Sequence, residues 1–83
     1  MQTIDAVALS ILGILYQIVK EDVHPLSYGV KPRELILHAM QDWTAIHASL
    51  TTLEKEGYVV TRQVDTLQVL LTEKGLQWCQ EKS

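Results

Sequence analysis

The chain has 83 residues, of which seven are basic, ten are acidic and one is a cysteine, and its formal net charge is −3. This length is enough for about one compact domain, so we expect residues 1–83 to form a single domain. One cysteine cannot make an intrachain disulfide, which excludes a small secreted fold held together by cystines. The negative net charge is unusual for a protein that binds a polyanion, because phosphate contacts need local Lys and Arg.

The first predicted element is a helix from about Thr3, its N-cap, to Glu21. Its apolar residues repeat at helical spacing in two stripes. One stripe contains Ile4, Ala8, Ile11, Leu15 and Ile18, and the other contains Val7, Leu12, Ile14, Tyr16 and Val19. A helix that is apolar nearly all round needs cover on more than one side, which either the other helices or a second copy of the chain would supply.

The most apolar stretch, residues 6–19, does not have the features of a membrane or secretion signal. It is shorter than the roughly 20 residues that a membrane-spanning helix needs. No Lys or Arg precedes it, as a signal peptide would require. We therefore expect a cytoplasmic protein.

A connection over residues 22–30 leads to a short second helix that begins at Pro32 and ends near Ala39. Proline fits the first turn of a helix because its missing N–H is not needed there. We expect Leu35 and Ile36 to point inward from this helix.

A third helix is predicted from its N-cap, Asp42, to Glu56. Gly57 follows and would take the left-handed conformation that closes a helix. The apolar face of this helix carries Trp43, Ile46, Leu50 and Leu53. Two helices separated by a few residues in this way form a helix-turn-helix.

Two strands and a last helix complete the predicted order. Residues 58–64 and 67–72 are rich in β-branched and apolar residues, with Asp65-Thr66 as the turn between them. Thr72 would cap a final helix that runs to the C-terminus. The expected fold is α+β, mainly α: a winged helix-turn-helix of three helices, a β-hairpin wing and a C-terminal helix.

Two motifs flank the predicted hairpin, Leu53-Glu54-Lys55-Glu56-Gly57-Tyr58-Val59 and Leu71-Thr72-Glu73-Lys74-Gly75. Together they resemble the wing-flanking motifs of MarR- and PadR-like transcriptional regulators, and the resemblance covers about residues 3–82. It implies a homodimer that places its third helix in the DNA major groove and its wing beside the backbone or minor groove. The motifs also have local roles, since a glycine at 57 closes a helix and one at 75 permits close packing of the last helix.

The candidate DNA-binding residues lie on three elements. The helical step of 100° turns one face of the third helix outward, and there short side chains and one cation could approach base edges. Phosphate contacts would come from the start of the second helix and from the hairpin. The candidates are Lys31, Arg33, Thr44, His47, Ala48, Thr51, Lys55 and Arg62. The alternative is a solvated helix face without a binding role, and Asp65 at the wing tip argues against deep minor-groove insertion.

The residues give little support to catalysis or to metal binding. His24, His38 and His47 do not have a metal-ligand spacing, and Cys79 has no second thiol. No glycine-rich phosphate loop or nucleophile elbow is present. We expect no enzyme activity, no metal and no cofactor. His38 and His47 are expected to be ordinary, partly buried histidines, and Cys79 to pack in the core or a dimer seam.

Two functions therefore remain open. The first is a DNA-binding transcriptional regulator that acts as a homodimer through its first helix, its last helix or both, with double-stranded DNA as its partner. The second is a winged-helix module for protein interaction or dimerisation without DNA binding, which the acidic balance and the small number of basic residues in the wing favour.

Overall fold

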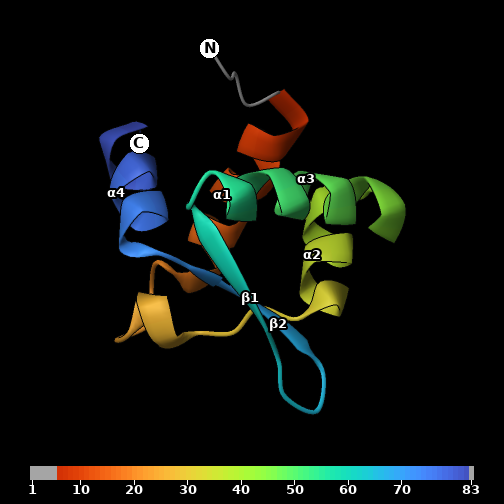
Figure 1. The fold of residues 1–83 in the computed structure, drawn as a ribbon. Helices are drawn as coiled ribbons and strands as arrows, with labels where there is room; N and C mark the ends of the chain where they lie inside the picture. Colours follow the sequence, from red (N-terminus) through yellow and green to blue (C-terminus); the bar gives the residue numbers. More distant parts are fainter. Residues whose placement is uncertain (1–5, 83) are drawn as a thin grey trace.

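The computed structural model describes residues 6–82 and has the predicted order of elements (Figure 1). The helices are α1 (Ala6–Val19), α2 (Pro32–Ala39), α3 (Trp43–Lys55) and α4 (Glu73–Lys82), and the strands are β1 (Val59–Gln63) and β2 (Leu67–Leu71). A short 3-10 helix, η1 (Pro25–Ser27), lies in the predicted connection. The expected fold class, a mainly helical α+β winged helix-turn-helix, is confirmed. The predicted cap at Thr3, with Ile4, lies outside the described residues.

The central helix of the core is α1. The helices α2, α3 and α4 and the strand β2 all pack against it. Its fully buried side chains are Ala8, Ile11, Leu12, Leu15 and Val19. The rest of the chain therefore supplies much of the cover that this helix needs, although 43% of Val7 stays exposed. Within residues 6–82, no helix combines the length and the apolar character needed to cross a membrane.

The helix-turn-helix forms as the local signals predict. The Asp42 carboxylate accepts a hydrogen bond of 3.0 Å from the Ala45 N–H, which caps α3. Gly57 takes a φ of 86° after the last turn of α3, and the Tyr58 N–H donates to the Leu53 carbonyl at 2.9 Å. This is the left-handed glycine closure expected at the end of a helix. The apolar face rests on the core, where Ile46, Leu50 and Leu53 are buried and Trp43 is half-buried.

One inward position of α2 was predicted wrongly. Leu35 is fully buried, but Ile36 is 38% exposed. Successive residues of a helix differ by 100° in direction, and Leu35 is the one fully buried residue of α2, so the core covers the direction in which Leu35 points and not that of Ile36. Leu37 and Met40 are also exposed, at 70% and 89%. Met40 adopts the left-handed conformation, with a φ of 55°, and closes α2.

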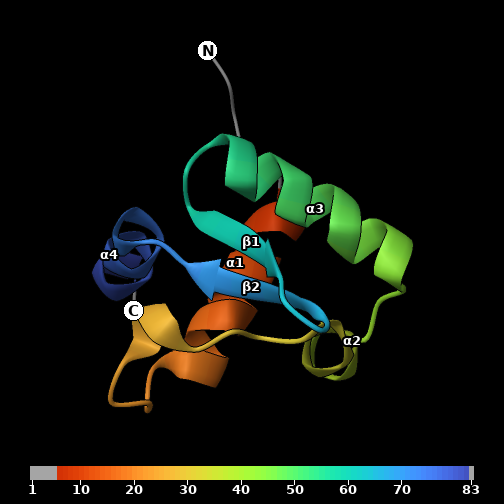
Figure 2. The same cartoon turned by 60° about the horizontal axis from the view of Figure 1, so that its bottom comes forward.

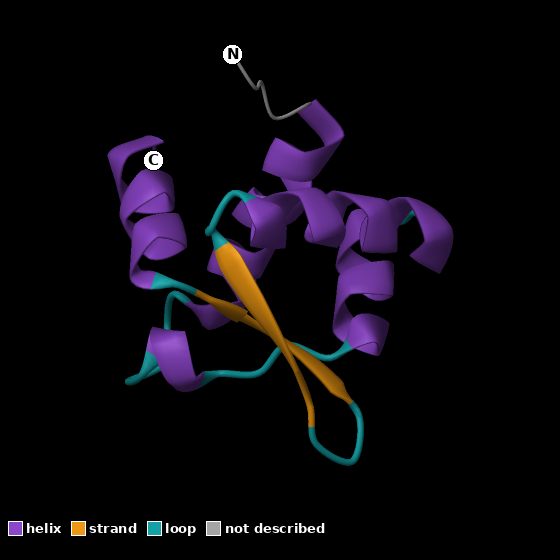
Figure 3. Ribbon diagram, viewed as in Figure 1, coloured by secondary structure: helices purple, strands orange, loops and turns teal. Residues whose placement is uncertain are grey.

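The two strands form an antiparallel hairpin in which Val59 pairs with Leu71 and Gln63 with Leu67. Its tip projects beyond the helices, with α4 and α2 on opposite sides of its base (Figures 1 and 3). On the outer edge of β2, Val30 and Val69 exchange two backbone hydrogen bonds of 2.8 Å. This bridge fixes the start of α2 against the hairpin.

The closing helix α4 returns to pack on α1 and β2. The Thr72 hydroxyl accepts a hydrogen bond of 3.1 Å from the Gly75 N–H, as expected of an N-cap. A Cβ atom at Gly75 would collide with the Tyr58 carbonyl, so glycine is needed there for the close approach of helix and strand. Cys79 is buried, and its thiol lies 3.7 Å from the Leu12 carbonyl of α1.

Candidate nucleic-acid interface

The outward face of α3 carries the five candidate residues of this helix. Figure 2 shows α3 lying across one side of the molecule, with α2 seen almost end-on beside it. The exposed residues of this face are Thr44, His47, Ala48, Thr51 and Lys55. Thr44, Ala48 and Thr51 are small, so the backbone of α3 can come close to a surface that it meets along these positions. A groove of DNA is such a surface, since the major groove is wide enough to admit a helix.

Two of the three threonine hydroxyls on α3 are already used as donors. Thr51 donates to the His47 carbonyl at 3.0 Å, and Thr52 donates to the Ala48 carbonyl at 3.3 Å. What the Thr51 side chain offers to a partner is therefore its methyl group and the free lone pairs of its oxygen. These groups suit the thymine methyl or a base amino group better than they suit a phosphate oxygen, which needs a donor.

The carboxylate of Glu54 links α3 to the hairpin. It accepts a 3.1 Å hydrogen bond from the Thr61 N–H and a 3.0 Å hydrogen bond from the Thr61 hydroxyl. Lys55 follows Glu54 in the chain, and Arg62 follows Thr61. The two hydrogen bonds therefore bring the backbones that carry these two cations together, although the residues are seven apart in sequence.

The side chain of Arg62 points away from α3. Successive side chains of a strand alternate between its two faces, and Thr61 faces Glu54. The guanidinium of Arg62 instead donates to the Gln68 side chain of β2 at 3.3 Å. Arg62 is exposed on the hairpin, as is Asp65 at the tip. The hairpin thus presents one cation at its side and one carboxylate at its end.

Lys31 and Arg33 lie at the start of α2, next to the bridge between Val30 and Val69. The Glu34 carboxylate holds this end of the helix, because it accepts hydrogen bonds from the Lys31 N–H at 3.2 Å and from the Tyr28 hydroxyl at 3.0 Å. The bond to Glu34 raises the pKa of Tyr28. Both cations are exposed, and within residues 6–82 the guanidinium of Arg33 makes no hydrogen bond or ion pair.

All eight candidate residues are exposed. The hydrogen bonds between Glu54 and Thr61 and the bridge between Val30 and Val69 connect their three elements. The structure does not test their binding role, which stays a prediction.

The two histidines near the helix-turn-helix turn, His38 and His47, are exposed rather than partly buried as predicted. The Nδ1 atom of His38 lies 2.8 Å from the Glu34 carbonyl, and the His47 ring lies 5.8 Å from the Trp43 ring between centroids.

Comparisons with known proteins support the fold alone. No protein-family model matches the chain, and no curated protein matches its sequence. A crystal structure from Ralstonia eutropha JMP134, described as a "putative DNA-binding protein", is similar with a TM-score of 0.79. The match covers 96% of this chain and 98% of the other chain at 17% sequence identity. The arrangement of helices and hairpin is thus found in another protein of nearly the same extent.

Proposed function

We propose that this chain is a DNA-binding transcriptional regulator that acts as a homodimer and inserts α3 into the major groove. The observation that carries the proposal is the outward face of α3, which exposes the small side chains of Thr44, Ala48 and Thr51. This helix is held to the wing through Glu54 and Thr61. The resemblance of the wing-flanking motifs to MarR- and PadR-like regulators supports it. The description of the Ralstonia eutropha protein as DNA-binding supports it as well.

The exposed cations would supply the phosphate contacts. Lys31 and Arg33 at the start of α2 and Lys55 at the end of α3 would flank a duplex that lies along α3. Arg62, whose side chain points away from α3, would contact the phosphate backbone beside the hairpin. A few phosphate contacts per subunit give modest affinity that falls steeply with salt. Discrimination between bases would be limited, because the outward face of α3 has no Arg, Asn or Gln for bidentate contacts. Two subunits would place their α3 helices in successive major grooves, about 34–36 Å apart.

Fluorescence anisotropy with a labelled random duplex tests the proposal. We expect binding at micromolar protein concentration in low salt, with a logarithm of the association constant that falls linearly with the logarithm of the salt concentration. Absence of salt-sensitive binding under these conditions would refute DNA binding.

One observation favours a second function, a protein-interaction module that does not bind DNA. Ile36, Leu37 and Met40 expose apolar side chains at the end of α2, next to the turn of the helix-turn-helix. Contiguous exposed apolar residues can indicate a protein contact. Under this alternative, Leu37→Lys would abolish capture of a protein partner, whereas Lys55→Ala would leave it unchanged.

A further inference from the structure

Gly29, just before α2, is packed against a side chain of the hairpin. A Cβ atom built at Gly29 would overlap the Oε1 atom of Gln68 and would lie 2.8 Å from its Cδ atom. Unlike Gly57, Gly29 does not have a left-handed φ, so its backbone conformation would allow other residues. What glycine provides at position 29 is therefore space for the Gln68 side chain.

The chain on both sides of Gly29 is held in place. Val30 exchanges two backbone hydrogen bonds of 2.8 Å with β2, and the Tyr28 hydroxyl donates to the Glu34 carboxylate at 3.0 Å. These bonds oppose a shift of the segment away from the hairpin. The end of the Gln68 side chain is flexible, so it is the part that would move if position 29 carried a methyl group.

The Gln68 side chain also holds the cation of the hairpin. Its Oε1 atom, the atom beside Gly29, accepts a hydrogen bond of 3.3 Å from the Arg62 guanidinium. Arg62 and Gln68 are directly opposite in the hairpin, so their side chains lie on the same face. A guanidinium has five N–H groups, and the bond to Gln68 leaves most of them available to an anion. Through Gln68, Gly29 therefore influences where an exposed cation points.

We propose that Gln68 is a positioning residue that holds the Arg62 guanidinium for contact with a phosphate, and that Gly29 keeps open the space that this arrangement needs. The inference rests on the proposed function, in which Arg62 contacts the phosphate backbone beside the hairpin. A side chain that is ordered before binding loses less conformational entropy when it binds. Since Gly29 lies two residues before Lys31, the same contact fixes Arg62 relative to the cations at the start of α2.

NMR relaxation of the Nε–H groups of Arg33 and Arg62 tests the positioning in the absence of DNA. Arg33 is the internal reference, because within residues 6–82 its guanidinium makes no hydrogen bond or ion pair. We expect a higher order parameter for Arg62 than for Arg33 in the wild-type protein. Gly29→Ala should lower the Arg62 value to that of Arg33. The urea midpoint should change little, because only the end of one side chain moves.

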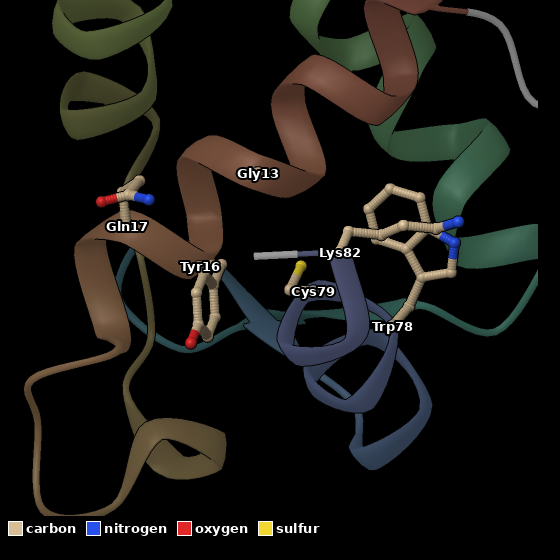
Figure 4. Close-up of a pocket in the computed structure, with 6 residues that line it drawn as sticks. All are labelled: Gly13, Tyr16, Gln17, Trp78, Cys79 and Lys82. Carbon is tan, nitrogen blue, oxygen red and sulfur yellow. The ribbon is translucent and has the colours of Figure 1, made fainter.

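Variants of Gln68 separate the role of its amide oxygen from the packing of its side chain. Gln68→Met keeps the length of the side chain but removes the amide, so it should release Arg62. Gln68→Glu keeps an acceptor at the same place and should keep Arg62 ordered. One matched control is Gln63→Met, on the opposite face of β1. The other is Gly13→Ala, whose methyl group would lie beside the hollow between α1 and α4 with nothing within 4 Å (Figure 4). Both controls should leave Arg62 ordered.

Fluorescence anisotropy with a duplex then tests whether the positioned cation is used in binding. Gly29→Ala and Gln68→Met should each raise the dissociation constant by about two- to tenfold, the usual cost of ordering one long side chain. Neither should change the slope of the salt dependence, because Arg62 can still reach a phosphate. Arg62→Ala should instead reduce that slope by about 1 per subunit. In the Arg62→Ala background, Gly29→Ala should have no further effect.

The inference would be overturned if Arg62 is as mobile as Arg33 in the wild-type protein, or if Gly29→Ala leaves Arg62 ordered. It would also be overturned if Gly29→Ala releases Arg62 but binds duplex as tightly as wild type, a result that would leave the proposed function standing. If Gly29→Ala releases Arg62 but no form of the protein binds duplex, DNA binding is refuted, and the hold of Gln68 on Arg62 is confirmed.

Discussion

Glu54 and Thr61 join the last turn of α3 to the first strand of the hairpin, through two hydrogen bonds to one carboxylate oxygen. The N–H of Thr61 points out from the free edge of β1, where an unpaired donor could otherwise pair with a strand of another chain. The same pair therefore protects the sheet edge and fixes the direction of the wing relative to α3. In the proposed complex, both elements would meet the duplex at once.

We predict that Glu54→Ala weakens DNA binding although it removes a negative charge. Loss of the two hydrogen bonds should lower the free energy of unfolding by about 1–2 kcal/mol, and it should let the hairpin move relative to α3. Urea denaturation and duplex anisotropy measure the two effects. Glu81→Ala removes the same charge from an exposed position on α4 and is the control. Equal or tighter binding by Glu54→Ala would show that the orientation of the wing does not matter.

Gly13 and Gly75 should respond in opposite ways to alanine. Gly75→Ala forces a Cβ atom into the Tyr58 carbonyl, and we expect a loss of about 1–3 kcal/mol in the free energy of unfolding. Gly13→Ala adds a methyl group in open space inside a helix and should raise that free energy by roughly 0.5–1 kcal/mol. Urea denaturation at concentrations that keep the chain monomeric compares the two. A large destabilisation by Gly13→Ala would mean that α1 is packed differently.

Lys55 and Thr51 should contribute to DNA binding in different ways. Lys55→Ala should weaken binding to all duplexes and reduce the slope of the salt dependence by about 1 per subunit. Thr51→Ala removes a methyl group and an acceptor and should leave the slope unchanged while altering the preference for A·T pairs. Lys20→Ala, just after α1, is the control for loss of a charge. If Lys55→Ala and Lys20→Ala have the same effect, the outward face of α3 has no special role.

The buried thiol should be unreactive in the folded protein. Burial raises the pKa of Cys79 from 9.0 to about 11, so the thiol stays protonated at pH 8, and only the thiolate reacts quickly. We expect a thiol reagent to modify Cys79 slowly at pH 8 in buffer and rapidly in denaturant. Because the folded state holds this proton more tightly than the unfolded state, its contribution to stability is present below pH 9 and is lost as the pH rises from 9 to about 11. Rapid modification in buffer would show that α4 leaves α1 easily.

The sequence was sufficient to predict the elements that local chemistry determines. Pro32, Asp42 and Gly57 act at single positions of the backbone, and each marks a helix end within one residue of the observed one. The burial of Ile46 and Leu50 follows from the helical repeat alone. The exposed face of α3 could therefore be predicted before any coordinates were known.

Contacts between distant segments could not be predicted in this way. The hydrogen bonds between Glu54 and Thr61 depend on the direction that the hairpin takes after Gly57. The bridge between Val30 and Val69 joins two residues far apart in sequence, and no local sequence motif predicts that they pair. The exposure of Ile36 depends on which side of α2 the core covers. Among residues 6–82, the open space above Gly13 depends on where α4 packs along α1.

Backbone amide NMR of the chain titrated with a short duplex tests most directly the claim that α3 and the wing bind DNA. The account predicts salt-sensitive chemical-shift changes for Thr44, Ala48 and Thr51, with smaller changes at the start of α2 and along the hairpin. Changes confined to Leu37 and Met40 at the other end of α2, or no change at saturating duplex, would contradict it.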